Sequence, residues 1–203
     1  MPHLIQLLKQ AGIDVKEISG IIVAKGPGSF NGLRVGISTA KGLAFSLGVP
    51  IVGINTLEAT AYQHAEAGLP ICPILNAGRG EIATAIYQKE NNRWQQIISE
   101  HISTVDSLCA KIESKTIFCG ELTPTIIDEL TARLGQKAII PPPAARLRRA
   151  GFLAELGLKR LQAGDCDQPS TLQPIYLRRP QITQPKHKNR TANQRKKPAS
   201  ETG

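Results

Sequence analysis

Residues 25–58, KGPGSFNGLRVGISTAKGLAFSLGVPIVGINTLE, decide the fold class of this 203-residue chain. The β-branched run just before them, residues 20–24, predicts a short buried strand, and residues 51–54 predict a second one. Between the two, residues 31–47 predict a helix that the following glycine and proline end. A strand, a helix and a second strand in this order form one βαβ unit, which predicts an α/β fold with parallel strands.

The turn ahead of this helix is rich in glycine. Gly26 and Gly28 permit backbone angles that other residues avoid, and Ser29 can cap the helix by accepting a hydrogen bond from a free N–H group. The bare N–H groups of a helix N-terminus can also hold a phosphate. Because neither GxxxxGK[ST] nor GxGxxG is present, the sequence indicates a structural turn, with a phosphate site as the alternative.

Small residues recur every four positions along the predicted helix. Glycine inside a helix costs roughly 1 kcal/mol relative to alanine, and close approach of another backbone is the usual reason for it. The pattern predicts tight packing of this face, either against the protein's own sheet or first helix or against a partner subunit. The candidate interface residues are Gly32, Leu33, Gly36, Ile37, Ala40 and Lys41.

The rest of the chain predicts further strands and helices. Residues 70–75 and 81–88 alternate as a β-hairpin around a glycine-containing turn, and residues 144–162 predict a last helix. We therefore expect three parts: a first lobe over residues 1–68, a second α/β lobe over residues 69–179, and a tail over residues 180–203.

The tail carries most of the net charge of +9. Residues 178–203 contain eight Lys or Arg and one acid, whereas residues 1–177 contain 17 bases and 15 acids. With few apolar residues, the tail cannot bury enough surface to order itself, and we predict that it is disordered. It contacts RNA phosphates through counterion release, or it is a solvated segment without a specific partner.

No catalytic constellation is evident in the sequence. The four histidines are scattered, and the four cysteines form no CxxC pair, so we expect no metal site and no catalytic residue. Glu81 is the best single carboxylate candidate, although a charge at a hairpin edge is the simpler interpretation. No apolar run approaches the roughly 20 residues of a membrane helix and no secretory signal is evident, which predicts a cytoplasmic protein.

Several of these segments resemble the bacterial TsaB (YeaZ) family. Residues 26–34 match its GPGSFTGLR-type turn except that Asn31 stands where the family has Thr, and residues 39–44 match its TAKGLA helix. Residues 73–81 and 174–178 are similar to its P-x-[IL]-D-A-R-[RK]-G-E and P-x-Y-L-R segments, with Asn76 in place of Asp. The resemblance covers about residues 1–180 and is most specific in the first third.

The resemblance implies an actin/sugar-kinase-like (ASKHA) duplicated α/β fold. Family members open with a strand that carries an Asp-Thr-Ser motif and with two further strands, whereas this chain starts at or just inside the first helix. The expectation is therefore a truncated N-terminal lobe. Either translation starts upstream of Met1, which is the favoured interpretation, or the chain is a genuine fragment.

The resemblance also implies a function. TsaB-like proteins are non-catalytic partners of a TsaD-like transferase and, with a TsaE-like ATPase, support threonylcarbamoylation of the tRNA adenosine adjacent to the anticodon. ATP and Mg²⁺ would be used by that complex, with no cofactor bound by this chain alone. A homodimer is possible. The alternatives are a glycoprotease-like or ATP-binding enzyme of the same fold, or a degenerate fragment without function.

Overall fold

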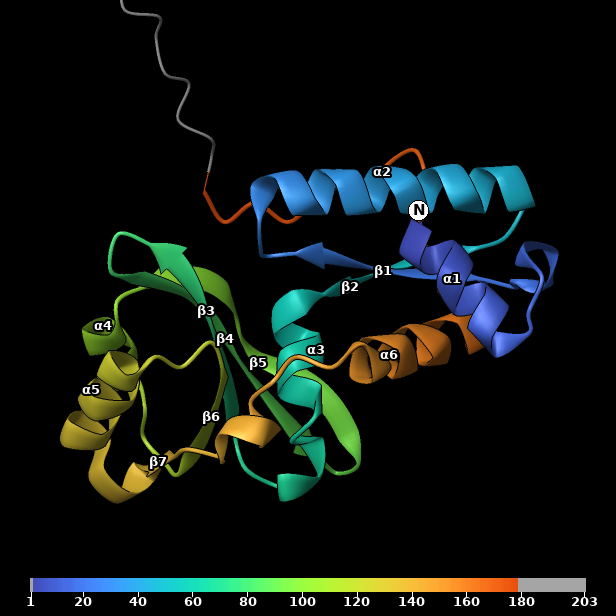
Figure 1. The fold of residues 1–203 in the computed structure, drawn as a ribbon. Coiled ribbons are helices and arrows are strands. Elements are labelled where there is room, and N and C mark those ends of the chain that lie inside the picture. Colours follow the sequence, from blue (N-terminus) through green and yellow to red (C-terminus); the bar gives the residue numbers. More distant parts are fainter. Residues whose placement is uncertain (1, 179–203) are drawn as a thin grey trace, which may run out of the picture.

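Two β-sheets, each covered by helices, form the computed structural model of this protein, which describes residues 2–178 (Figure 1). The helices are α1 (Pro2–Ala11), α2 (Phe30–Leu47), α3 (Thr56–Tyr62), α4 (Val105–Cys109), α5 (Pro124–Leu134) and α6 (Ala150–Gln162). The strands are β1 (Ile21–Gly26), β2 (Ile51–Asn55), β3 (Ile71–Gly78), β4 (Glu81–Glu90), β5 (Arg93–Ser103), β6 (Thr116–Gly120) and β7 (Ala138–Ile139). No helix within residues 2–178 is both long and apolar enough to cross a membrane.

The predicted βαβ unit is present. Strands β1 and β2 pair in parallel with Ile21 opposite Ile51, and α2 connects them. Ser29 caps α2 by accepting a hydrogen bond from the Gly32 N–H. Gly48 ends the helix in the left-handed conformation (φ 67°), with its N–H donating to the last turn. Local sequence signals therefore set both ends of this helix.

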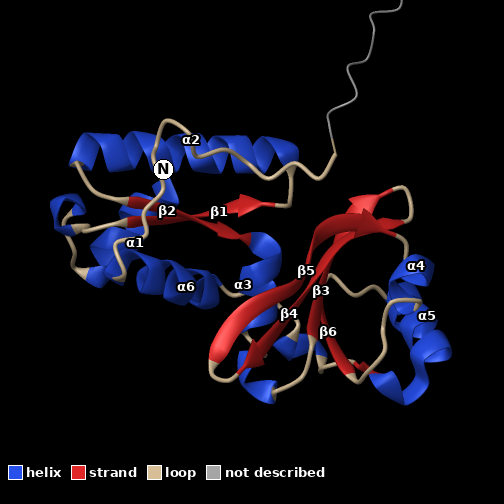
Figure 2. Ribbon diagram, turned by 180° about the vertical axis from the view of Figure 1, so that it is seen from behind, coloured by secondary structure: helices blue, strands red, loops and turns tan. Residues whose placement is uncertain are grey.

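Helices α2 and α6 cover opposite faces of the two-stranded sheet (Figures 1 and 2). On the α2 side, Ile37 and Ala44 pack with Ile51 of β2 in one buried cluster. On the other side, Leu156 of α6 packs against Val52 of β2. Because β2 is buried on both faces, it reads as a continuous apolar run rather than as an alternating one.

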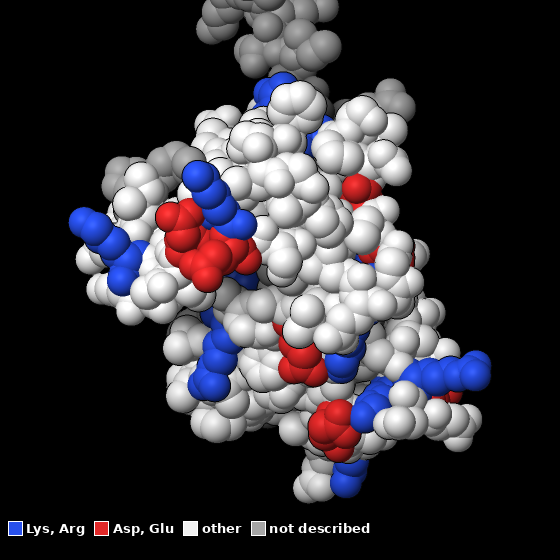
Figure 3. Space-filling model, turned by 90° about the vertical axis from the view of Figure 1, so that its right-hand side faces the viewer, with Lys and Arg blue, Asp and Glu red and all other residues white. Residues whose placement is uncertain are grey.

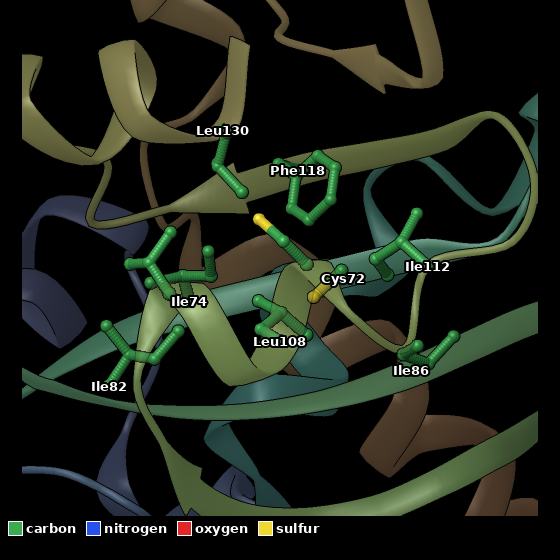
Figure 4. Close-up of a cluster of buried hydrophobic side chains, with 10 residues drawn as sticks. Cys72, Ile74, Ile82, Ile86, Leu108, Ile112, Phe118 and Leu130 are labelled. Carbon is green, nitrogen blue, oxygen red and sulfur yellow. The ribbon is translucent and has the colours of Figure 1, made fainter. Parts of the chain in front are cut away.

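The second sheet has five strands in the order β5-β4-β3-β6-β7. β3 and β4 form the predicted antiparallel hairpin, whereas β6 pairs in parallel with both β3 and β7. Helices α4 and α5 cover one face, where Phe118 and Leu130 are fully buried in the largest apolar cluster (Figure 4). Helix α3 covers the other face through Leu57 and Ala61.

After α6 the chain runs along the first sheet as a segment without a regular helix or strand, residues 165–178, which we call the C-terminal strap. The Asp167 N–H donates to the Ile51 carbonyl (2.9 Å), and the Ile175 N–H donates to the Lys25 carbonyl (2.7 Å). Arg178, at the end of the strap, forms an ion pair with Glu81 of the second sheet. The strap thus contacts both sheets.

Two expectations need qualification. The predicted helix over residues 144–162 begins only at Ala150, because Arg149 is extended (φ −118°, ψ 126°) and Arg148 is held by Glu121 (2.9 Å) in the preceding segment. Moreover, α6 and the strap pack on the first sheet, although they follow the second one in the sequence. The lobe boundary at residue 68 stays a prediction, and the predicted disordered tail lies outside the described residues.

The packing of α6 on β1 generates a prediction. A methyl group added at Gly157 would clash with the side chain of Ile22, which is β-branched and held in β1. We expect Gly157→Ala to lower the free energy of unfolding by about 1–3 kcal/mol. Urea unfolding of the purified protein measures the change.

The matched control lies in the same helix. An added methyl group at Gly151 would meet nothing within 4 Å. Gly151→Ala should therefore leave the free energy of unfolding unchanged or raise it by up to about 1 kcal/mol. Equal effects of the two substitutions would contradict the close contact between α6 and β1.

Candidate functional site

The six predicted interface residues of α2 do not form one surface. Ile37 and Ala40 are buried against the protein's own first sheet, so a partner subunit cannot reach them. A methyl group added at Gly36 would meet nothing within 4 Å. Packing against the protein's own sheet therefore explains Ala40 but not Gly36. Gly32 is exposed, whereas Leu33, Gly36 and Lys41 are half-buried.

The exposed side of α2, which we call the outer face, has residues that the sequence analysis missed. Val35 is 67% exposed and Phe45 is 87% exposed. The other exposed residues of α2, Phe30 aside, are small or polar, and Arg34 is the only charged one; they are Asn31, Gly32, Arg34, Ser38, Thr39, Gly42 and Ser46. A helix face with a single charged residue and large exposed apolar side chains is typical of an interaction surface.

Other parts of the surface differ in their charge distribution. On the face shown in Figure 3, Lys and Arg side chains lie close to Asp and Glu in small groups, with uncharged residues between them. On α6, Glu155 and Lys159 form an exposed i,i+4 ion pair (3.0 Å). Exposed pairs of this kind stabilise a fold by a few tenths of a kcal/mol at most and do not mark a site.

The glycine turn ahead of α2 is structural at Gly26. This residue has φ 102°, and an added methyl group would lie 2.9 Å from Cδ1 of Leu33 and 3.1 Å from the Ile175 carbonyl oxygen. Gly26 therefore gives the turn a conformation and a close approach that other residues would not permit. Ser29 uses its hydroxyl for the helix cap. The alternative of a phosphate site at Gly26, Gly28 and Ser29 stays a prediction.

A groove of about 610 Å³ lies between this turn and the β3–β4 turn of the second sheet, and we call it the inter-sheet groove. The C-terminal strap forms part of its wall. The lining residues are Pro27, Gly28, Phe30, Leu75, Asn76, Ala77, Gly78, Arg79, Ala83, Ile102, Ile175, Tyr176, Leu177 and Arg178. The residues that line this groove come from stretches that lie far apart in the chain. The groove is therefore not recognisable from the sequence alone.

A second, smaller cavity of about 250 Å³ is polar and lies at the carboxyl ends of β1 and β2. Burial raises the pKa of Glu58 there, against the opposing effects of a hydrogen bond with Trp94 and of the positive charges of Lys25 and Arg160. Glu100 accepts hydrogen bonds from Asn55 and Gln96 in the same cavity. This network joins the first sheet, α3 and β5, which is a structural role.

Two buried cysteines and Glu81 do not supply a nucleophile or a free acid. Cys72 and Cys119 are fully buried, and burial raises the pKa of the Cys72 thiol to about 12 and that of Cys119 well above its ordinary value. The thiolate needed for nucleophilic attack is therefore disfavoured at neutral pH. Glu81 is paired with Arg178. Within residues 2–178, no group of three or more His, Cys, Asp or Glu is placed to hold a metal ion.

Comparison with known proteins identifies the family. Residues 1–185 match the family model described as TsaD, tRNA N6-adenosine threonylcarbamoyltransferase. The tRNA threonylcarbamoyladenosine biosynthesis protein TsaB of Bacillus subtilis (strain 168) is 33% identical over 181 residues, which are 88% of this chain and 77% of that protein. The chain belongs to the TsaB family. The resemblance found in the sequence is thereby confirmed.

Solved structures agree with this membership. A Pseudomonas aeruginosa protein with similarity to peptidase YeaZ superposes with a TM-score of 0.71 at 23% identity, covering 87% of this TsaB-family chain and 82% of that chain. YeaZ from the same organism gives a TM-score of 0.69 at 21% identity. These likenesses confirm the expected α/β fold of the actin and sugar-kinase type.

Transferase relatives are matched over a smaller share of their own length than TsaB of B. subtilis. The tRNA N6-adenosine threonylcarbamoyltransferase of Geotalea uraniireducens (strain Rf4) is 48% identical to this chain, but only over 54 residues. That segment is 27% of the TsaB-family chain and 16% of the transferase. The similarity to TsaB of B. subtilis extends over most of both chains, which distinguishes the two kinds of relative.

The polar cavity generates a pH-dependent prediction. Because the pKa of Glu58 is raised in the folded state, its proton stabilises the fold, and this stabilisation is complete below the unfolded-state pKa of about 4.5. The stabilisation is lost as the pH rises through the raised pKa. We therefore expect Glu58→Gln, which cannot ionise, to gain stability relative to the wild type between pH 4 and pH 7. Urea unfolding across this pH range measures the difference.

Glu129→Gln on the exposed side of α5 controls for the loss of one carboxylate. The two variants could instead differ from the wild type by the same free energy of unfolding at every pH. That result would show that ionisation of Glu58 does not make the stability depend on pH.

Proposed function

We propose that this TsaB-family chain is a subunit of tRNA threonylcarbamoyladenosine biosynthesis and acts as the partner of a TsaD-like transferase. The observation that carries the proposal is the 33% identity to TsaB of B. subtilis over 88% of the chain. That protein is named for this biosynthesis, and the transferase is named for transfer to a tRNA adenosine. The expected compartment is the cytoplasm.

The outer face of α2 is the proposed contact surface for the transferase. Phe45 is 87% exposed and Val35 is 67% exposed, so a partner that covers them would remove a large apolar area from water. Gly42 lies on this face and adds no side-chain bulk, so a second helix could approach the backbone of α2 closely there. A second copy of this chain is the competing occupant.

The chain is proposed to lack catalytic activity of its own. The raised pKa of the Cys72 thiol and the pairing of Glu81 support this proposal, because both groups are unsuited to attack or proton transfer. ATP and Mg²⁺ would be used by the complex, in which a TsaE-like ATPase takes part and to which tRNA binds. The alternative of a glycoprotease-like or ATP-binding enzyme predicts peptide cleavage or ATP binding by the isolated chain.

Co-expression with the TsaD-like protein of the same genome tests the proposal. We expect the two proteins to elute together in size-exclusion chromatography, and Gly42→Leu to abolish this co-elution because the leucine side chain would hold the partner helix away. The fold should persist, since nothing in this chain lies within 4 Å of the added Cβ. Circular dichroism and thermal unfolding check the fold.

Gly151→Leu is the matched control, because it places the same side chain on α6, where an added Cβ also meets nothing within 4 Å. Separate elution of the unsubstituted proteins would contradict the proposed function. Co-elution that survives Gly42→Leu would instead remove the outer face of α2 as the contact surface.

The tail gives a further prediction, based on sequence alone. Deletion of residues 180–203 should leave the pairing with the transferase intact, because the proposed contact lies on α2. It should lower only the salt-sensitive retention of RNA, because residues 180–203 contain six of the eight Lys and Arg residues counted in residues 178–203. Loss of co-elution on deletion would show that the tail takes part in the contact between the subunits.

A further inference from the structure

We propose that the inter-sheet groove binds an unpaired nucleotide of RNA, with the base stacked on Phe30 and Tyr176 and the phosphate beside the groove's arginines. This inference rests on the proposed function, because it assigns the tRNA-facing surface of the same subunit. The volume of about 610 Å³ lies within the range of about 300–1,000 Å³ that is typical of ligand sites.

The aromatic wall of the groove is the first argument. Phe30 begins α2 and Tyr176 lies in the C-terminal strap, yet their ring centroids are 5.2 Å apart with planes at 36°. The two residues are 41% and 42% exposed, so the fold does not cover them. Exposed aromatic rings in a groove are platforms on which bases of any sequence stack.

The charge of the groove is the second argument. Arg79 and Arg178 line it, and none of its described lining residues is acidic. Arg34 adds a third guanidinium group, whose central carbon lies 5.0 Å from the Phe30 centroid. Glu81 forms an ion pair with Arg178 and offsets part of the positive charge. Guanidinium groups beside the aromatic wall favour an anion there.

The position of the basic segment is the third argument. Arg178 lines the groove, and the chain continues from it into residues 179–203, which contain seven Lys or Arg and one Glu. The segment that continues directly from this groove residue therefore has a composition suited to binding phosphates. A polymer with many phosphates gains from both features, whereas a free mononucleotide has no phosphate beyond its own to offer to the basic segment.

The stacking geometry also selects the form of RNA. In a duplex the bases are stacked and paired inside the helix, and a protein ring reaches them only in loops, bulges and single strands. We therefore expect the groove to prefer single-stranded RNA over duplex RNA. A free nucleotide has the same base and phosphate groups and is the second ligand that the experiment must distinguish. A segment of a partner protein is a different occupant, which the experiment can reveal.

Fluorescence anisotropy with the full chain tests the proposal. The probes are a labelled single-stranded RNA of about 12 nucleotides and the duplex of the same sequence. We expect tighter binding of the single strand, and an affinity about tenfold lower for Tyr176→Ala, as for the loss of one base–aromatic stack. Tyr176→Phe should retain the affinity. Leu158→Ala removes an exposed apolar side chain of α6 outside the groove and should leave the affinity unchanged.

Competition separates the two sources of nucleotide. An excess of AMP should displace the RNA poorly. Full displacement by AMP at the concentration at which RNA itself competes would show a mononucleotide site and overturn the RNA assignment. Equal binding of single-stranded and duplex RNA, with no effect of Tyr176→Ala, would also overturn it.

Crosslinking of the unsubstituted chain gives a readout that does not depend on the folding of a variant. After irradiation with thiouridine-containing RNA, we expect crosslinked peptides from residues 27–34 or 174–178. Crosslinks confined to residues 180–203, or none at all, would overturn the groove as the site.

Co-elution with the transferase and binding of RNA are separate measurements, so the RNA site can fail while the proposed function holds. Co-elution of Tyr176→Ala with the transferase, together with the loss of RNA affinity, is the expected pair of results. Intact co-elution without groove crosslinks would remove the RNA site and leave the proposed function in place. If Tyr176→Ala lost the transferase and kept RNA, the groove would hold a protein segment, which overturns the inference.

Discussion

The return of the C-terminal strap to the first sheet is the constraint on which the arrangement of the two sheets depends. Backbone N–H groups of the strap donate hydrogen bonds to the carbonyls of Ile51 in β2 and Lys25 in β1. Residues from the end of the described chain therefore complete a sheet that is formed near its beginning. Between these bonds Leu172 is buried against Ile51. The same path then brings Tyr176 to Phe30 and Arg178 to Glu81, which forms one wall of the inter-sheet groove.

Arg160 fixes the start of this path. Its guanidinium donates to the Gly53 carbonyl (3.0 Å) and to the Asp165 carboxylate (2.6 Å), while the Asp167 carboxylate accepts from the Gly53 N–H (2.8 Å). Hydrogen bonds to charged groups are stronger than those between neutral groups. Both peptide groups of Gly53 are thus satisfied by side chains from α6 and the strap rather than by a further strand.

Glycine is required at position 53 for the same reason. A methyl group there would lie 2.7 Å from Cδ1 of Leu172 and 3.2 Å from Cδ of Lys25. The absence of a side chain lets the strap pass close over β2. Sequence reasoning treated this glycine only as part of an apolar strand, because the residues that crowd it are more than a hundred positions away or on the neighbouring strand.

Local signals made much of the fold predictable. The cap at Ser29, the left-handed Gly48 and the apolar runs define β1, α2 and β2 within one or two residues, and the hairpin of β3 and β4 follows from alternation. The strap has no periodic pattern, and its conformation is fixed by distant partners such as Lys25 and Ile51. The beginning of α6 depends likewise on a tertiary ion pair with Glu121.

The candidate interface was only partly predictable because a four-residue spacing drifts around a helix. Each step of four residues advances by roughly 40°. The row from Gly32 through Gly36 to Ala40 therefore begins on the surface and ends in the core, where Ala40 is buried. The exposed positions of Val35 and Phe45 follow a different line, which becomes visible only once the buried side of α2 is known.

Helix α2 presents its two proposed surfaces at a useful separation. Phe30, in the inter-sheet groove, and Phe45, on the outer face, are 15 residues apart in one uninterrupted helix, which corresponds to roughly 22 Å along its axis. A partner helix centred toward the Phe45 end and a nucleotide at the Phe30 end can therefore be bound together. Because the helix is rigid and capped at both ends, a subunit docked on the outer face would be held in a fixed orientation relative to RNA in the groove. Such an arrangement would let the proposed subunit orient the RNA for its partner.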